Sequence, residues 1–64
     1  MPPKTGEIYV EFVVQGSVVK VTAIDPKTGM EACIVGPAGG SRAALSDAAL
    51  RKLKFVLQKN NGGI

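Results

Sequence analysis

The segment that comes nearest to a ligand-binding motif is the glycine-rich stretch GPAGGSR, residues 36–42. A phosphate-binding P-loop requires G-x-x-x-x-G-K-[ST], in which the lysine neutralises the phosphate and the hydroxyl holds magnesium. Counted from its first glycine, the last three positions of that motif are Ser41, Arg42 and Ala43, and none of them fits. The spacing also differs from the dinucleotide fingerprint G-x-G-x-x-G. We expect a connector and no cofactor, with a weak anion site at a helix start near Ser41 as the alternative.

The residue types that usually perform catalysis are scarce. The chain has no histidine, which removes the commonest general base and the commonest metal ligand. Cys33 is the single cysteine and lacks that activating partner, so we interpret it as a packing residue, with a reactive thiol as the enzymatic alternative. The carboxylates of Glu7, Glu11, Asp25 and Glu31 are spread out and suggest no acid–base pair or metal cluster. We expect neither an enzyme nor a metal site nor a small-molecule substrate.

Basic residues are concentrated in the C-terminal part of the chain. The net charge is +3. The segment after position 40 contains five basic residues and only one acidic residue, Asp47. Such a patch on a helix can bind nucleic acid weakly through phosphate contacts, although a solvated helix face has the same composition. The alternative function is therefore a nucleic-acid accessory protein, with these candidate contacts: Arg51, Lys52, Lys54 and Lys59.

Residues 6–25 predict a β-hairpin. The stretch EIYVEFVVQGSVVKVTAID alternates apolar and polar residues for most of its length and breaks at Gln15-Gly16. We interpret it as strands 6–15 and 17–25, with a two-residue loop in which the glycine takes a positive φ. On one face Glu11 then lies opposite Lys20 as an ion pair. The other face pairs Val14 with Ser17, Phe12 with Val19, Val10 with Val21 and Ile8 with Ala23.

A second turn is predicted at DPKTG, residues 25–29. Pro26 fixes φ, Asp25 can accept a hydrogen bond from the backbone ahead of it, and Gly29 takes a left-handed conformation. A third strand, 30–36, ends at a proline. Its register pairs Asp25 with Met30, Ala23 with Ala32 and Val21 with Ile34.

The C-terminal part has helical periodicity. We predict a glycine-rich connector over 37–45 and a helix over 46–59, with Ser46 as the N-cap. An earlier start, with Ser41 as the cap and Leu45 inside the helix, is the alternative. The apolar stripe consists of Ala49, Leu50, Leu53, Val56 and Leu57.

These elements predict one α+β domain over residues 1–64. Three antiparallel strands form a meander in the order 1-2-3, and the C-terminal helix packs on one face, giving β-β-β-α. We expect a disordered arm over 1–5 and a disordered tail over 60–64. The helix covers the face formed by Ile8, Val10, Phe12, Val19, Val21 and Ile34.

The opposite, open face of the sheet is the candidate interaction surface. It carries one lysine and two glutamates, and this composition is poorly suited to contacting bases or phosphates. Several of its other side chains are apolar, and exposed apolar patches commonly mark an interface. The candidate protein interface consists of Tyr9, Val13, Val18, Ile24 and Val35, together with Phe55 on the helix flank. The expected partner is a protein, and a second copy in a homodimer is the first choice.

Length and composition limit the classes of protein to which the chain can belong. A chain of 64 residues is a single domain that buries only about 60% of its unfolded surface. At 45% hydrophobic residues it is globular. One cysteine permits no internal disulfide, and no membrane-length apolar run is present. We expect no signal peptide, because MPPKTGE lacks the apolar core of one. We expect a cytoplasmic protein with no membrane partner.

The run IYVEFVVQGSVVKVTAIDPKTGMEACIVGP, followed by RKLKFVL, resembles a family of small bacterial proteins, mainly alphaproteobacterial, known as a domain of unknown function. The similarity covers nearly the whole chain. The resemblance implies a cytoplasmic bacterial protein, and it brings no activity, cofactor or catalytic residue with it.

Overall fold

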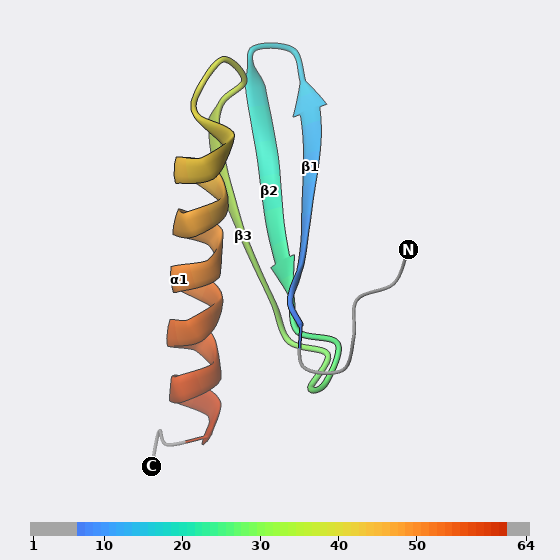
Figure 1. Cartoon of the computed structure of the whole chain (residues 1–64), viewed down its shortest axis with the longest axis vertical. Coiled ribbons are helices and arrows are strands. Elements are labelled where there is room, and N and C mark those ends of the chain that lie inside the picture. The colour runs from blue at the N-terminus through green and yellow to red at the C-terminus, as the bar shows by residue number, and fades with distance from the viewer. Residues whose placement is uncertain (1–6, 62–64) are drawn as a thin grey trace.

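The chain folds into three strands and one helix in the predicted order. The computed structural model describes the backbone of residues 7–61 and the side chains of residues 7–59. The strands form one antiparallel sheet in the order β1-β2-β3, and the helix α1 lies against one side of it (Figure 1). The α+β class and the β-β-β-α meander are therefore confirmed. The elements are β1 (Tyr9–Gln15), β2 (Val18–Ile24), β3 (Glu31–Pro37) and α1 (Arg42–Asn61).

The first hairpin turns at Gly16-Ser17, one residue later than predicted. Gln15 pairs with Val18, so the predicted register, with Val14 opposite Ser17, was wrong by two residues. The reason is the turn type. Gly16 has a φ of 64° and no non-glycine residue described here has a positive φ, which fits a type II′ turn with glycine in the first loop position.

A shift of two residues keeps every side chain on its predicted face but changes its partner. Glu11 lies opposite Thr22, so the predicted pairing of Glu11 with Lys20 was wrong. Lys20 lies instead opposite Val13. The remaining pairs include Val14 with Val19, Phe12 with Val21 and Val10 with Ala23.

The second turn has the predicted geometry. The Asp25 carboxylate accepts hydrogen bonds from the Lys27 backbone N–H at 2.9 Å and the Thr28 hydroxyl at 3.2 Å. Gly29 has a φ of 78°, and the Asp25 N–H donates to the Met30 carbonyl at 2.9 Å. The polar side chain of Asp25, only 8% exposed, is thus satisfied within the turn. The β2–β3 register is confirmed, with Ala23 opposite Ala32 and Val21 opposite Ile34.

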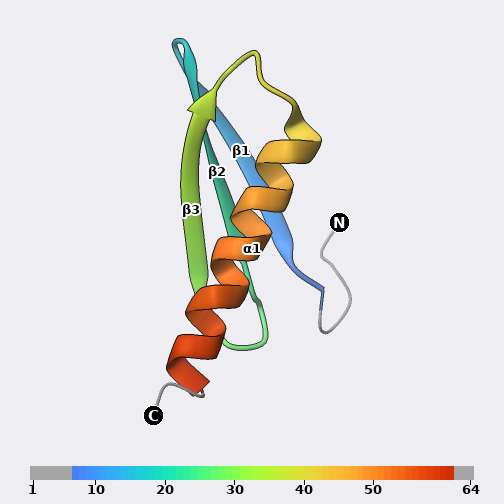
Figure 2. The same cartoon turned by 90° about the vertical axis from the view of Figure 1, so that its left-hand side faces the viewer.

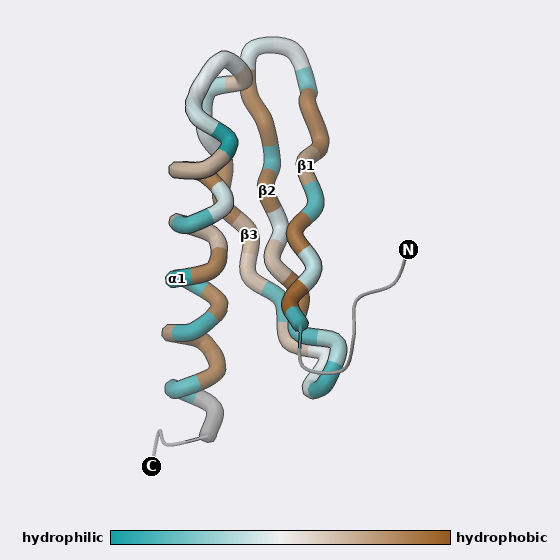
Figure 3. The backbone as a smooth tube through the Cα atoms, viewed as in Figure 1, coloured by the Kyte–Doolittle hydropathy of each residue, from teal (hydrophilic) through white to brown (hydrophobic). Residues whose placement is uncertain are grey.

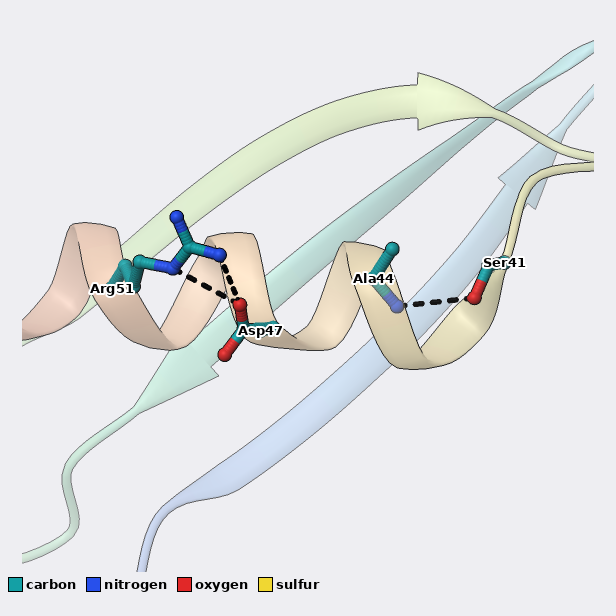
Figure 4. Close-up of polar contacts among 4 residues, drawn as sticks. All are labelled: Ser41, Ala44, Asp47 and Arg51. Atoms are coloured by element: carbon teal, nitrogen blue, oxygen red, sulfur yellow. Dashed lines mark hydrogen bonds and ion pairs between the residues drawn. The ribbon is translucent and has the colours of Figure 1, made fainter.

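The helix begins directly after Ser41, which is its N-cap (Figure 4). The Ser41 hydroxyl accepts a hydrogen bond from the Ala44 N–H at 3.2 Å, and its carbonyl accepts one from the Leu45 N–H at 3.0 Å. The favoured cap, Ser46, and the connector over 37–45 were therefore wrong, and the earlier start is confirmed. The connector is shorter because Leu45 packs onto the sheet from inside the helix.

Gly36 allows this first helical turn to approach β3 closely. A Cβ added at Gly36 would overlap the Cδ2 atom of Leu45. The next turn of the chain is equally tight, because the Gly40 N–H donates to the Pro37 carbonyl at 2.9 Å. The segment GPAGGSR thus connects the last strand to the helix over a very short path.

The core lies between α1 and the strands β3 and β2, on which the helix packs. Figure 2 shows α1 crossing the sheet obliquely, and Figure 3 shows its hydrophobic segments turned towards the strands. This core is small and contains three alanines, so it buries little apolar surface per residue. Its buried members among the described residues are Val19, Val21, Ala23, Ala32, Ala49 and Leu53.

The ends of the elements differ modestly from prediction. The strands predicted over 6–15, 17–25 and 30–36 begin and end within three residues of the observed bounds, and the helix continues two residues beyond 59. The predicted tail therefore starts too early, while its residues 62–64 and the predicted arm over 1–5 lie outside the described residues. In the described part of the chain, no helix has the length and apolarity needed to span a bilayer.

Candidate interaction surface

The open face of the sheet, away from α1, gathers the predicted strand residues into cross-strand rows. Val13, Lys20 and Val35 form one row across the three strands. The next row places Val18 between Gln15 and Pro37. We call Val13, Val18 and Val35 the valine cluster; their side chains are 48%, 41% and 66% exposed. Three strands thus each contribute one exposed valine to the same end of the open face.

The other end of the open face holds the remaining two predicted residues. Tyr9 is exposed and lies beside the half-buried Ile24. A row consisting of Glu11, Thr22 and Cys33 separates this pair from the valine cluster. The open face therefore has an apolar patch at each end and a polar row between them. The predicted interface residues on this face do not form one continuous patch.

Charges on the open face are of both signs. Lys20 stands between two valines of the cluster, whereas Glu11 lies one row away and Glu31 lies in the row of Tyr9. All three side chains are exposed. A surface with this composition can meet a second copy of itself with opposite charges facing each other.

Phe55 does not belong to this surface. It lies on α1, which covers the opposite face of the sheet, and its side chain is 60% exposed. The Lys59 ammonium group lies 5.7 Å from the centre of its ring, within the range of a cation–π contact. The structure therefore joins five of the six candidate interface residues on one side of the sheet and leaves Phe55 apart.

A second apolar surface lies where the helix does not cover β1. Val14, on the helix side of the sheet, is 55% exposed, because α1 packs over β3 and β2. Further along the strand, the Arg42 guanidinium lies 4.7 Å from the centre of the Phe12 ring. Beyond it, a groove of about 310 Å³ is lined by Ile8, Leu50, Leu53, Lys54 and Leu57.

Sequence reasoning placed Val14 on the same face of the sheet as Phe12, and Leu50 in the apolar stripe of the helix. Their residue types and spacing fit the apolar face of the sheet and the apolar stripe of the helix. Leu50 is nevertheless 36% exposed. No signal in the sequence indicates that α1 lies nearer to β3 than to β1. Its position depends on how closely the helix approaches Gly36.

The basic residues of the helix point in different directions. Lys52 donates a hydrogen bond from Nζ to the Cys33 carbonyl of β3 at 2.8 Å, whereas Lys54 lines the groove on the β1 side. Arg51 pairs with Asp47 one turn earlier, with Nε 3.0 Å from the carboxylate (Figure 4). These three cations are thus divided between two flanks and an ion pair, and nucleic-acid binding stays a prediction without a geometric argument for it.

The remaining chemical candidates are dispersed. Cys33 is half-buried in the polar row of the open face, next to Thr22. Among residues 7–61, no three side chains of the histidine, cysteine, aspartate or glutamate type gather as metal ligands. In the glycine-rich connector, Gly36 and Gly40 lie close to Leu45 and Pro37, and Arg42 beside it stacks on an aromatic ring.

Comparison with known proteins identifies one family. A family model described as a domain of unknown function, DUF6898, matches residues 5–60, which include all three strands and all but the last residue of the helix. Neither the curated proteins nor the solved structures provide a match. Because the family model spans most of the 64 residues, the chain belongs to the DUF6898 family.

Proposed function

We propose that this protein is a non-enzymatic interaction module that self-associates through the open face of its sheet. The observation that carries the proposal is the valine cluster, in which three neighbouring strands expose Val13, Val18 and Val35 on the side away from the helix. Contiguous exposed apolar side chains of this kind favour burial against another protein.

The size of the core supports the same proposal. A domain of this length has little surface to bury internally, and half of the buried hydrophobic residues among residues 7–59 are alanines. Burying the three valines against another molecule would remove further apolar area from water and stabilise the fold. The mixed charges of Lys20, Glu11 and Glu31 are compatible with a second copy as the partner.

The proposal is tested by sedimentation equilibrium from low to high micromolar concentration. We expect masses above that of the monomer, and we expect Val35→Lys to weaken the association, because it places a lysine in the cluster beside Lys20. Ala48→Lys is the matched control, since it adds the same charge at an exposed position of α1. A strict monomer at high micromolar concentration, or equal effects of the two variants, would overturn the proposal.

We also propose a cytoplasmic, bacterial setting for this activity. The lone cysteine supports a reducing compartment, since it allows no internal disulfide. The resemblance in the runs VKVTAIDPKTG and RKLKFVL supports a bacterial origin. Fractionation of the native host with an antibody against the chain tests this part, and recovery in the secreted or membrane fraction would contradict it.

A further inference from the structure

The two edges of the sheet expose different sets of backbone groups. In an antiparallel pair, residues alternate between those whose N–H and C=O groups face the neighbouring strand and those whose groups face away. Gln15 and Val18 close the two-residue hairpin and face each other. The groups that face the free edge of β1 therefore belong to Val10, Phe12 and Val14. On β3, the Ser17–Ala38 and Asp25–Met30 hydrogen bonds assign the free edge to Glu31, Cys33 and Val35.

The edge of β3 is protected against pairing with another strand. The Lys52 ammonium group reaches over from the helix and donates to the Cys33 carbonyl at 2.8 Å, so this acceptor on the edge is already occupied. Pro37 ends the strand and has no N–H to donate. A lysine and a proline at an edge are two of the devices by which proteins prevent edge-to-edge association.

The edge of β1 has neither device. Its seven residues, YVEFVVQ, include no proline and no basic residue, and the one charged side chain, Glu11, is on the open face. The side chains next to its free edge groups are Val10, Phe12 and Val14, on the helix side. Val14 is 55% exposed there, and the groove beside Ile8 continues the same apolar strip. Within the described residues, an edge without these two features and beside the exposed Val14 side chain is suited to accepting a further strand.

We propose that a second copy of this chain pairs antiparallel along β1 and extends the sheet to six strands. A second copy fits because the side chains next to the free edge groups, Val10, Phe12 and Val14, are apolar in both strands, while the cation beside them, Arg42, is already stacked on the Phe12 ring. A two-fold axis perpendicular to the sheet keeps both helices on one side. Because each helix packs over β2 and β3, the two helices stand about four strand spacings apart, roughly 19 Å at ~4.8 Å per strand, and do not collide.

Pairing along β1 limits the assembly to two copies. After it forms, both outer edges of the six-stranded sheet are β3 strands with the Lys52 contact and Pro37, so no further copy can add in the same way. The seam uses the edge and the helix side of β1, whereas the valine cluster lies on the open face. The β1 seam is thus a separate contact from the one in the proposed function, and each can exist without the other.

Two matched variants distinguish these contacts in sedimentation equilibrium. Val14→Lys and Val35→Lys make the same change on exposed strand side chains, the first beside the β1 edge and the second on the open face. If copies pair along β1, Val14→Lys raises the dissociation constant of that contact by roughly tenfold or more, because it places a lysine beside the pairing edge of each copy, where it opposes the addition of a strand. Val35→Lys leaves that contact unchanged. Far-UV circular dichroism checks that each variant is folded.

Amide hydrogen exchange of the unmodified chain gives a test that needs no variant. At high concentration the amides of Val10, Phe12 and Val14 should gain protection relative to a dilute sample, whereas those of Glu31, Cys33 and Val35 should not, since they face the other edge.

The outcomes are decisive for both proposals. Protection at the β1 edge together with dissociation by Val14→Lys supports the seam, whatever Val35→Lys does. Association that is lost in Val35→Lys, without protection of the β1-edge amides, supports the open-face contact and overturns the seam. A monomer at high micromolar concentration overturns both.

Discussion

Gly36→Ala tests the close contact between β3 and the first turn of α1. The new methyl group would overlap the Cδ2 atom of Leu45, which is half-buried and packs against the core. Overpacking of this kind costs about 1–3 kcal/mol. Replacing a strand glycine by alanine also recovers about 0.5–1 kcal/mol of backbone entropy. The free energy of unfolding should therefore fall by about 0–2.5 kcal/mol, with a central value of about 1 kcal/mol and the low end if the Leu45 side chain rotates.

This loss is large for so small a domain. At about 0.05–0.15 kcal/mol per residue, the whole chain has a free energy of unfolding of about 3–10 kcal/mol. The central value of about 1 kcal/mol corresponds to a decrease in melting temperature of roughly 4–8 °C. Urea and thermal unfolding followed by circular dichroism measure it. All samples must have the same protein concentration, because association adds to the apparent stability.

Gly39→Ala is the matched control. No atom lies within 4 Å of its added Cβ, and its φ is not positive. That variant should be as stable as the parent or more stable by about 0.4–1 kcal/mol. In a Leu45→Ala background, Gly36→Ala should cost nothing, since the overlapping methyl is gone. The reasoning is refuted if Gly36→Ala is as stable as Gly39→Ala, or if its cost is the same with and without the Leu45 side chain.

Three further predictions concern the cap, the second turn and the core. Ser41→Ala should lower the free energy of unfolding by about 1 kcal/mol, while Ser46→Ala stays within about 0.5 kcal/mol; the reverse order in urea unfolding would contradict the assigned helix start. Asp25→Ala should cost about 1–3 kcal/mol, because it leaves the hydrogen-bonding groups of the second turn without their acceptor; an unchanged urea midpoint would argue against this. Leu53→Ala, at a 2% exposed site, should cost about 2–5 kcal/mol, and more than Leu50→Ala at a 36% exposed site; equal losses would contradict the described core.

Much of the fold could be predicted from local patterns. Alternation along the strands assigns each side chain to a face, and DPKTG specifies its own turn through Asp25 and Gly29. The first hairpin shows the limit of this method. A shift of two residues leaves every face unchanged, so the hydrophobic pattern cannot detect it. Only the preference of glycine for the first position of a type II′ turn selects the loop at Gly16.

The helix start and the surfaces depend on tertiary contacts. Ser41 and Ser46 are equally good caps by residue type, and the packing of Leu45 over Gly36 decides between them. The open face follows from strand alternation and could be predicted. The exposure of Val14 could not, because it depends on where α1 lies across the sheet.

Contacts between copies at the valine cluster are the most direct test of the proposed function. In a mixture of isotope-labelled and unlabelled chains at high concentration, isotope-filtered NMR detects only contacts between different molecules. Self-association through the open face predicts intermolecular cross-peaks from the methyl groups of Val13, Val18 and Val35. Association without cross-peaks at these three valines, or cross-peaks confined to other residues, would contradict it.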